Sequence, residues 1–195
     1  KYKSSMRERS KPEIVTLRHR AHGTFEGLRD TGYEPTDSLE DSGDISISAE
    51  ASVIVVRVFA NQYGDVMVTV ADNGVGMDLD GLLNAMTYGS AQRANLKSLG
   101  KFGLGLKTAS TAMARKLTVV TRHDSDAPVI AATWDLDFVA ETDEWILQRP
   151  EPSDEQIAML DEVAQGQLGS AQQASISGRD ITNASIGMSE SFYRA

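Results

Sequence analysis

The stretch that decides the fold is residues 66–110, which reads Val66-Met67-Val68-Thr69-Val70-Ala71-Asp72-Asn73-Gly74-Val75-Gly76-Met77 and, after a connector, Leu99-Gly100-Lys101-Phe102-Gly103-Leu104-Gly105-Leu106-Lys107-Thr108-Ala109-Ser110. The first half is rich in β-branched residues, which predicts a strand that ends at the carboxylate of Asp72. The Asn-Gly-x-Gly turn that follows permits positive φ and lets a ligand approach the backbone. The second half is a glycine-rich loop that runs into a helix, and such a loop directs backbone N–H groups at an anion.

Together these two halves resemble the glycine boxes of the GHKL ATPases, a family that includes the gyrase B subunit, heat-shock chaperones, histidine kinases, MutL-type mismatch-repair proteins and MORC ATPases. The resemblance is carried by residues 72–77, by Gly89-Ser90 and by residues 99–110. It covers roughly residues 25–147 and is closest to MORC-like bacterial ATP-binding proteins. Either box alone is a weak signal, but two boxes in this order, a short helix and a loop apart, are a specific one.

The resemblance implies an α/β fold of the α+β kind, a two-layer sandwich with a mixed or antiparallel sheet covered by helices on one face. It implies a domain that binds ATP or ADP and hydrolyses ATP slowly with Mg²⁺, coupled to closure of a lid and to formation of a homodimer. The alternatives are an adenine-nucleotide sensor that does not hydrolyse ATP, and an interaction domain with a degenerate site.

Asp72 is the candidate for recognition of adenine. A buried carboxylate at a strand end accepts a hydrogen bond from the exocyclic amine of adenine and discriminates against guanine, which has an oxygen there. The alternative is that Asp72 only caps the turn at Asn73 and Gly74. Lys101 would neutralise phosphate charge. The nucleotide-binding residues that the resemblance implies are Asp44, Asp72, Gly74, Gly76, Met77, Gly100, Lys101, Phe102, Gly103, Leu104, Gly105, Leu106, Lys107 and Thr108.

Residues 37–49 occupy the place of the family's magnesium helix, with Asp37 as the expected N-cap. In the ungapped register Asp41 falls on the carboxylate that activates water, and Asp44 falls on the acidic residue before the metal-binding asparagine. Ile45 falls on the asparagine itself. Isoleucine cannot bind a hard cation, which requires oxygen ligands, so the metal ligands stay unknown. A shifted register would make Asp44 the base.

Local patterns predict the remaining elements. Helices are expected at residues 11–29, from Asp78 as an N-cap, at 104–115, and at 153–163 behind a Ser153-x-x-Gln156 capping box. Strands are expected at 51–59, 66–71, 117–122 and 129–134, with the first pair forming a hairpin. Residues 166–195 show little periodicity, which indicates disorder or a divergent edge. We expect a nucleotide-binding domain over residues 1–150, followed by a helix and tail of the same domain over 151–195.

The composition excludes several classes of protein. The 195 residues contain no cysteine, and no run of residues is apolar for long enough to span a membrane, which favours a cytoplasmic protein. The net charge of −9 does not indicate nucleic-acid binding, although the basic residues gathered in the first twenty positions leave that role open for the N-terminal segment.

Overall fold

The computed structural model describes residues 20–29, 35–60, 62, 65–89, 110–111, 114–165 and 169–176. Its helices are α1 (Ala21–Arg29), α2 (Pro35–Ser48), α3 (Leu79–Met86), α5 (Leu136–Thr142) and α6 (Asp154–Ala164). Its strands are β1 (Ile54–Ala60), β2 (Val66–Asp72), β3 (Lys116–Arg122), β4 (Ile130–Asp135) and β5 (Gly169–Ile176). None of the helices in the described ranges is long and apolar enough to cross a membrane.

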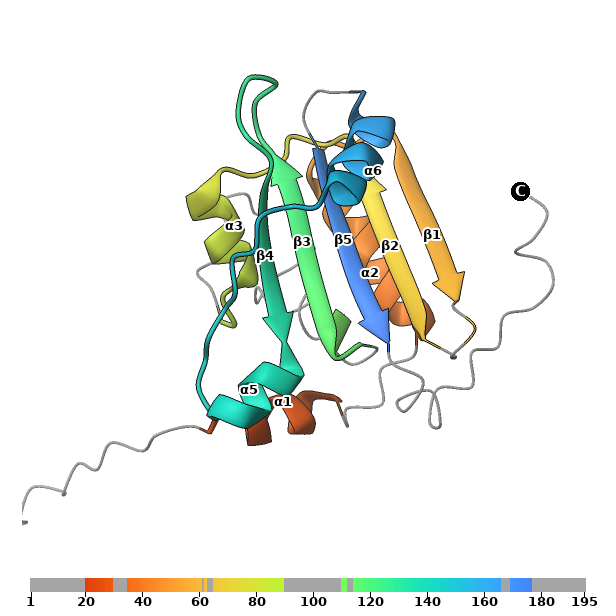
Figure 1. Ribbon diagram of the computed structural model, residues 1–195. Coiled ribbons are helices and arrows are strands. Elements are labelled where there is room, and N and C mark those ends of the chain that lie inside the picture. Colours follow the sequence, from red (N-terminus) through yellow and green to blue (C-terminus); the bar gives the residue numbers. More distant parts are fainter. Residues whose placement is uncertain are drawn as a thin grey trace, which may run out of the picture.

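The five strands form one antiparallel sheet in the order β1-β2-β5-β3-β4 (Figure 1). The expected β1–β2 hairpin is confirmed, and β3 pairs with β4 as well. The last strand, β5, lies at the centre between β2 and β3, where the sequence indicated only disorder or an edge. Its residues are mostly glycine, serine, alanine and glutamine, so they lack the apolar run that usually predicts a central strand.

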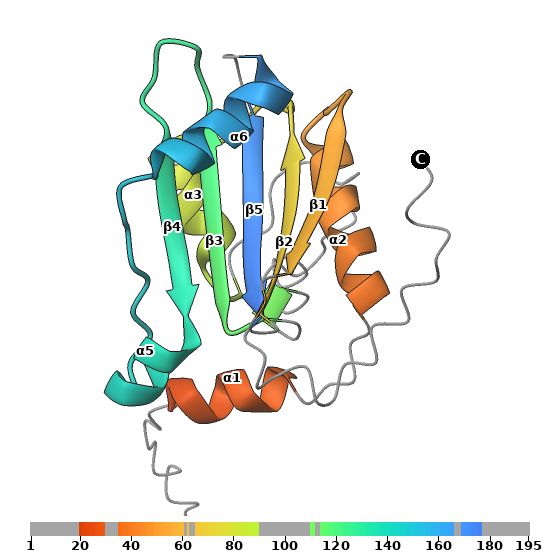
Figure 2. The ribbon, with the colours of Figure 1, turned by 45° about the vertical axis from the view of Figure 1, so that its right-hand side comes forward.

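Helices lie on both faces of the sheet (Figures 1 and 2). On one face Leu82 and Met86 of α3 pack with Leu117 and Val119 of β3, and α2 lies behind β2. On the other face α6 contributes Leu160, Val163 and Ala164, which pack on Ala71, Val120 and Ala131. The α+β architecture is as predicted, but α6 adds a helix to the second face because neighbouring strand residues are apolar on both sides.

Helix starts follow local side-chain chemistry. Asp78 caps α3, since its Oδ1 accepts a hydrogen bond from the Gly81 N–H at 2.8 Å. The predicted capping box of α6 is present: Ser153 Oγ accepts from the Gln156 N–H, and Gln156 Oε1 accepts from the Ser153 N–H. The prediction that Asp37 caps α2 is wrong, because α2 already begins at Pro35, and proline is well suited to the first helical turn. The expected helix at residues 11–29 is described only from Ala21.

Four aromatic rings join α1 to the sheet. Phe25 of α1 lies about equally close to Tyr88, Trp134 and Trp145, with ring centroids 4.9–5.3 Å away. The indole Nε1 of Trp134 donates to the Met86 carbonyl at 2.9 Å. Tyr88 contacts the other three rings, burial raises the pKa of its phenol, and its hydroxyl is 3.3 Å from that of Thr111. Phe25 is therefore the residue through which α1 joins this aromatic cluster.

Replacing Phe25 should test how far the fold depends on this cluster. The side chain is fully buried, so Phe25→Ala is expected to lower the free energy of unfolding by about 3–5 kcal/mol, measured by chemical denaturation. His22→Ala, on the exposed side of α1, should change it by less than about 0.5 kcal/mol. Equal effects of the two variants would contradict the packing role of Phe25.

Candidate functional site

Three strands bring their ends together at one end of the sheet. Asp72, the last residue of β2, pairs with Ser170 of β5, and Ser170 pairs on its other side with Thr121 of β3. The turn at residues 73–78 leaves the sheet here and leads into α3 (Figure 1). The C-terminal end of α2 reaches the same place, because the Ala49 carbonyl accepts a hydrogen bond from the Val75 N–H at 2.9 Å.

The Asp72 carboxylate is buried at this junction, with 4% of the residue exposed. Its Oδ2 accepts a hydrogen bond from the Ser46 hydroxyl at 2.8 Å, and its Oδ1 accepts from the Gly74 N–H at 2.9 Å. The second contact is the turn-capping bond that the sequence offered as the alternative role of Asp72. Two carboxylate oxygens present about four acceptor sites, so capping and ligand recognition are compatible.

The two glycines of the turn are required by the protein's own backbone. A Cβ on Gly74 would lie 2.7 Å from the Ala49 carbonyl oxygen. Gly76 has a φ of +64°, and a Cβ there would lie 2.0 Å from the Arg122 carbonyl oxygen. Both positions are therefore restricted to glycine by the fold before any ligand is considered.

Thr121 of β3 links the turn to β5 through two hydrogen bonds. Its hydroxyl is fully buried, accepts a hydrogen bond from the Met77 N–H at 2.9 Å and donates to the Gly169 carbonyl at 3.0 Å. A Cβ on Gly169 would lie 2.4 Å from the Asp72 carbonyl oxygen, so β5 also fits closely against β2. Sequence reasoning missed Thr121 and Ser46, because a threonine in a strand and a serine in a helix are common and carry no signal in a single sequence.

Helix α2 presents two different sides to its surroundings. Ser42 and Ser46 are buried, and Ser46 contacts Asp72. Ile45 is partly buried and packs against the core cluster that contains Phe25, Leu82 and Met86, with Met77 at the edge of the same cluster. Asp41 and Asp44 are half-buried on this continuous helix. The described residues contain no group of three or more histidine, cysteine, aspartate or glutamate side chains that could hold a metal ion.

The structure therefore brings together Asp72, Gly74, Gly76 and Met77, and it connects them to α2 through Ser46 and Ala49. The residues expected to bind phosphate lie outside the described ranges, and their roles stay predictions: Gly100, Lys101, Phe102, Gly103, Leu104, Gly105, Leu106, Lys107 and Thr108.

Comparison with protein families places most of the chain in a known family. The family model described as "Histidine kinase-, DNA gyrase B-, and HSP90-like ATPase" matches residues 33–169, which is well over half of the chain. The matched range begins just before α2 and ends at the first residue of β5, so it contains Ser46, Asp72, the turn at residues 73–78 and Thr121. No curated protein matches the chain. The narrower likeness to MORC-like proteins stays a prediction.

Two glycines allow a matched test of the turn. Gly76→Ala should lower the free energy of unfolding by about 1–3 kcal/mol, because alanine rarely adopts positive φ and its Cβ would overlap the Arg122 carbonyl. Gly43→Ala, inside α2 with no atom within 4 Å of the new Cβ, should raise it by about 0.5–1 kcal/mol. Thermal and urea unfolding would check both. A Gly76→Ala variant as stable as the wild type would show that the turn relaxes.

Proposed function

The chain belongs to the histidine kinase-, DNA gyrase B- and HSP90-like ATPase family, and from that premise we propose that it binds adenine nucleotides, ATP and ADP, at the Asp72 junction. The observation that carries the proposal is the buried Asp72 carboxylate, held by Ser46 and Gly74 at the end of β2. A carboxylate is rarely buried without a compensating partner, and here the hydrogen bonds from Ser46 and Gly74 also fix its direction.

The preference for adenine follows from the hydrogen-bonding character of the Asp72 carboxylate. Oxygens that only accept hydrogen bonds favour a ligand edge with an amine and disfavour one with a carbonyl. Because Ser46 and Gly74 already occupy one site on each oxygen, the carboxylate keeps its orientation before the ligand arrives. Met77, fixed through its N–H by Thr121, is the apolar residue we assign to packing on the purine.

The phosphates would be bound by the glycine-rich loop at residues 99–110, with Lys101 supplying positive charge. This assignment rests on the sequence and on membership of the family. Closure of the Tyr88–Ser98 stretch over the nucleotide is likewise an expectation taken from the family.

Magnesium fits the described residues poorly. In the ungapped register Ile45 falls on the position of the metal-binding asparagine, and its side chain packs against the apolar cluster instead of offering an oxygen. This favours a domain that binds nucleotide with little help from a metal and does not hydrolyse it. Slow hydrolysis is the second candidate, supported by Asp41, which precedes Ile45 by one turn of the uninterrupted α2.

Asp72→Asn tests adenine recognition. The amide replaces one acceptor oxygen by a donor, so affinity for ATP and for ADP should fall at least tenfold, about 1.4 kcal/mol, by titration calorimetry. The variant should still fold, because the Ser46 hydroxyl also lies 3.4 Å from the Ser42 carbonyl and keeps an acceptor. Asp80→Asn, an exposed acid in the first turn of α3, is the matched control and should leave affinity unchanged. Unchanged binding by a folded Asp72→Asn variant would refute the assignment.

Ile45→Asn tests the missing metal ligand. In the wild type, Mg²⁺ should change ATP affinity only slightly, whereas in the variant it should strengthen binding and speed phosphate release. Stability must be measured alongside, because an unpaired amide at the edge of the apolar cluster costs roughly 1–3 kcal/mol. Ile45→Val keeps the position apolar and serves as the control. Brisk hydrolysis by the wild type, with Ile45→Asn no faster, would mean that another residue holds the metal, and Asp44 would be the next candidate.

A further inference from the structure

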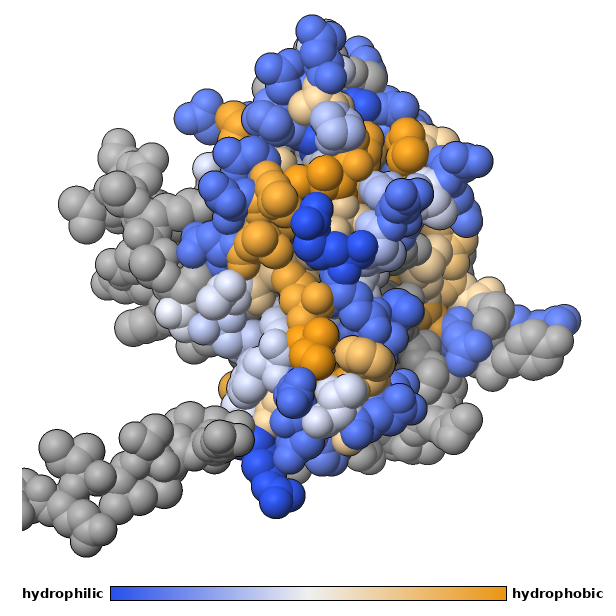
Figure 3. All heavy atoms as spheres, turned by 60° about the vertical axis from the view of Figure 1, so that its left-hand side comes forward, coloured by the Kyte–Doolittle hydropathy of each residue, from blue (hydrophilic) through white to orange (hydrophobic). Residues whose placement is uncertain are grey.

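The two edge strands of the sheet, β4 and β1, differ in whether another segment hydrogen-bonds to their outer side. At the β4 edge, Thr133 and Gln148 exchange both backbone hydrogen bonds, at 2.8 and 3.0 Å, so a following segment closes part of that edge. Figure 3 views the molecule from this side, where hydrophobic side chains form a narrow band between hydrophilic ones. At the other edge, β1 pairs with β2 and with no second strand among those that the structure describes.

The backbone of β1 presents a regular set of N–H and C=O groups along this edge, which no other described strand pairs with. The Val53 carbonyl accepts a hydrogen bond from the Asn73 N–H, which fixes the phase of the ladder with β2. In an antiparallel pair, only every second residue of a strand forms backbone hydrogen bonds with the partner strand. With Val53 bonded to Asn73, the odd-numbered residues of β1 are the ones that bond to β2. The N–H and C=O groups of Ile54, Val56 and Val58 therefore point outward, in the direction from which an added strand would bond.

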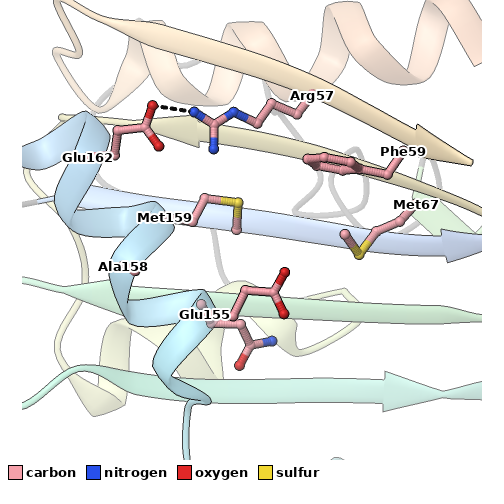
Figure 4. A pocket seen from close by; sticks show the side chains of 8 residues that line it. Arg57, Phe59, Met67, Glu155, Ala158, Met159 and Glu162 are labelled. Carbon is pink, nitrogen blue, oxygen red and sulfur yellow. Dashed lines mark hydrogen bonds and ion pairs between the residues drawn. The ribbon is translucent and has the colours of Figure 1, made fainter.

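The side chains along this edge are apolar and half exposed. Ile54, Val56 and Val58 expose 36%, 43% and 40% of their surface, and Phe59 exposes 50%. Exposed edges in natural sheets usually carry lysine, proline or a bulge that prevents pairing, and the β1 sequence contains neither of these residues. Its one charged residue, Arg57, forms an ion pair with Glu162 of α6 (Figure 4).

Both faces of the sheet are apolar beside β1. On the α6 side, a hollow of about 230 Å³ lies between β1, β2 and α6, and its apolar lining comes from Phe59, Met67, Ala158 and Met159 (Figure 4). On the α2 side, Ile54, Val56 and Val58 follow one another at every second position. An added strand would thus find apolar neighbours above and below the sheet.

We propose that β1 is the docking edge for β1 of a second copy of this chain, with the two strands antiparallel about a two-fold axis at Val56. In this register Val56 lies opposite Val56 of the second copy, and Ile54 lies opposite its Val58. These pairs use the outward backbone groups and are apolar. A two-fold axis at Arg57 would instead place two arginines opposite one another, which is unfavourable. The Val56 register sets Arg57 opposite Val55 of the second copy.

Self-pairing suits this edge better than pairing with a charged peptide. The chain carries a net charge of −9, so two copies repel over most of their surfaces, but β1 is uncharged apart from the neutralised Arg57. Each exposed aliphatic position meets another apolar side chain, which is the self-complementarity that a two-fold interface requires. The contact between the two β1 strands is short and would bury less area than a typical stable interface. We therefore expect a dissociation constant on the order of micromolar.

Single cysteines can test the register, because the chain has none of its own. Val56→Cys brings two thiols together at the axis, with Cα atoms about 5.5 Å apart, and should give a covalent dimer on mild oxidation. Val58→Cys is the matched control. Its two thiols would lie roughly 13 Å apart along the strands, too far for a disulfide. Equal cross-linking at both positions would indicate random collision and would overturn the proposal.

Reversible association is measured on the whole chain by sedimentation over a range of concentrations. The wild type should dimerise, and Val56→Lys should weaken the dimer at least tenfold while unfolding as the wild type does. Ala140→Lys, which adds the same charge on the exposed side of α5, should leave it unchanged. A wild type that stays monomeric at millimolar concentration overturns the proposal, and so does equal weakening by both lysines. Protection of β1 amides from hydrogen exchange in a monomer would assign the edge to another occupant and also overturn it.

Discussion

The site depends on the buried carboxylate of Asp72 and on the hydrogen bonds that Ser46 and Gly74 donate to it. Asp72 has lost nearly all contact with water, and such a loss is tolerated only when hydrogen bonds replace the hydration shell. One donor comes from α2 and the other from the turn after β2, so the carboxylate joins a helix, a strand and a turn at a single point. If any of these three elements moved, a buried charge would lose a partner.

The same end of the sheet is shaped by close approaches of backbone to backbone. Gly74 lies against Ala49, Gly76 against Arg122, and Gly169 against Asp72, each at a distance that excludes a side chain. Thr121 adds a bridge between the turn and β5. The protein's own contacts thus fix the turn against the strand ends, which reduces the ordering cost of binding a ligand there.

Structural features that are determined by a few neighbouring residues could be predicted from the sequence. The strand ending at Asp72, the cap at Asp78 and the capping box at Ser153 depend on local chemistry, and the structure contains all three. Features that depend on tertiary partners could not be predicted. β5 has a small, polar composition and is central only because β2 and β3 flank it, while the role of Ser46 arises from its distance to a residue in another element. Asp41, Asp44 and the phosphate loop stay predictions, because their roles require a ligand.

The contact between Tyr88 and Thr111 joins two positions that lie far apart in the sequence. The two hydroxyls lie 3.3 Å apart, and Arg29 of α1 donates to the Thr111 carbonyl at 2.9 Å. These residues stand on either side of the part of the sequence that contains the second glycine box. Folding therefore brings together two positions that lie 23 residues apart in the sequence, and the entropy of that closure is lost when the domain folds. A nucleotide that binds after folding does not have to supply that closure entropy again.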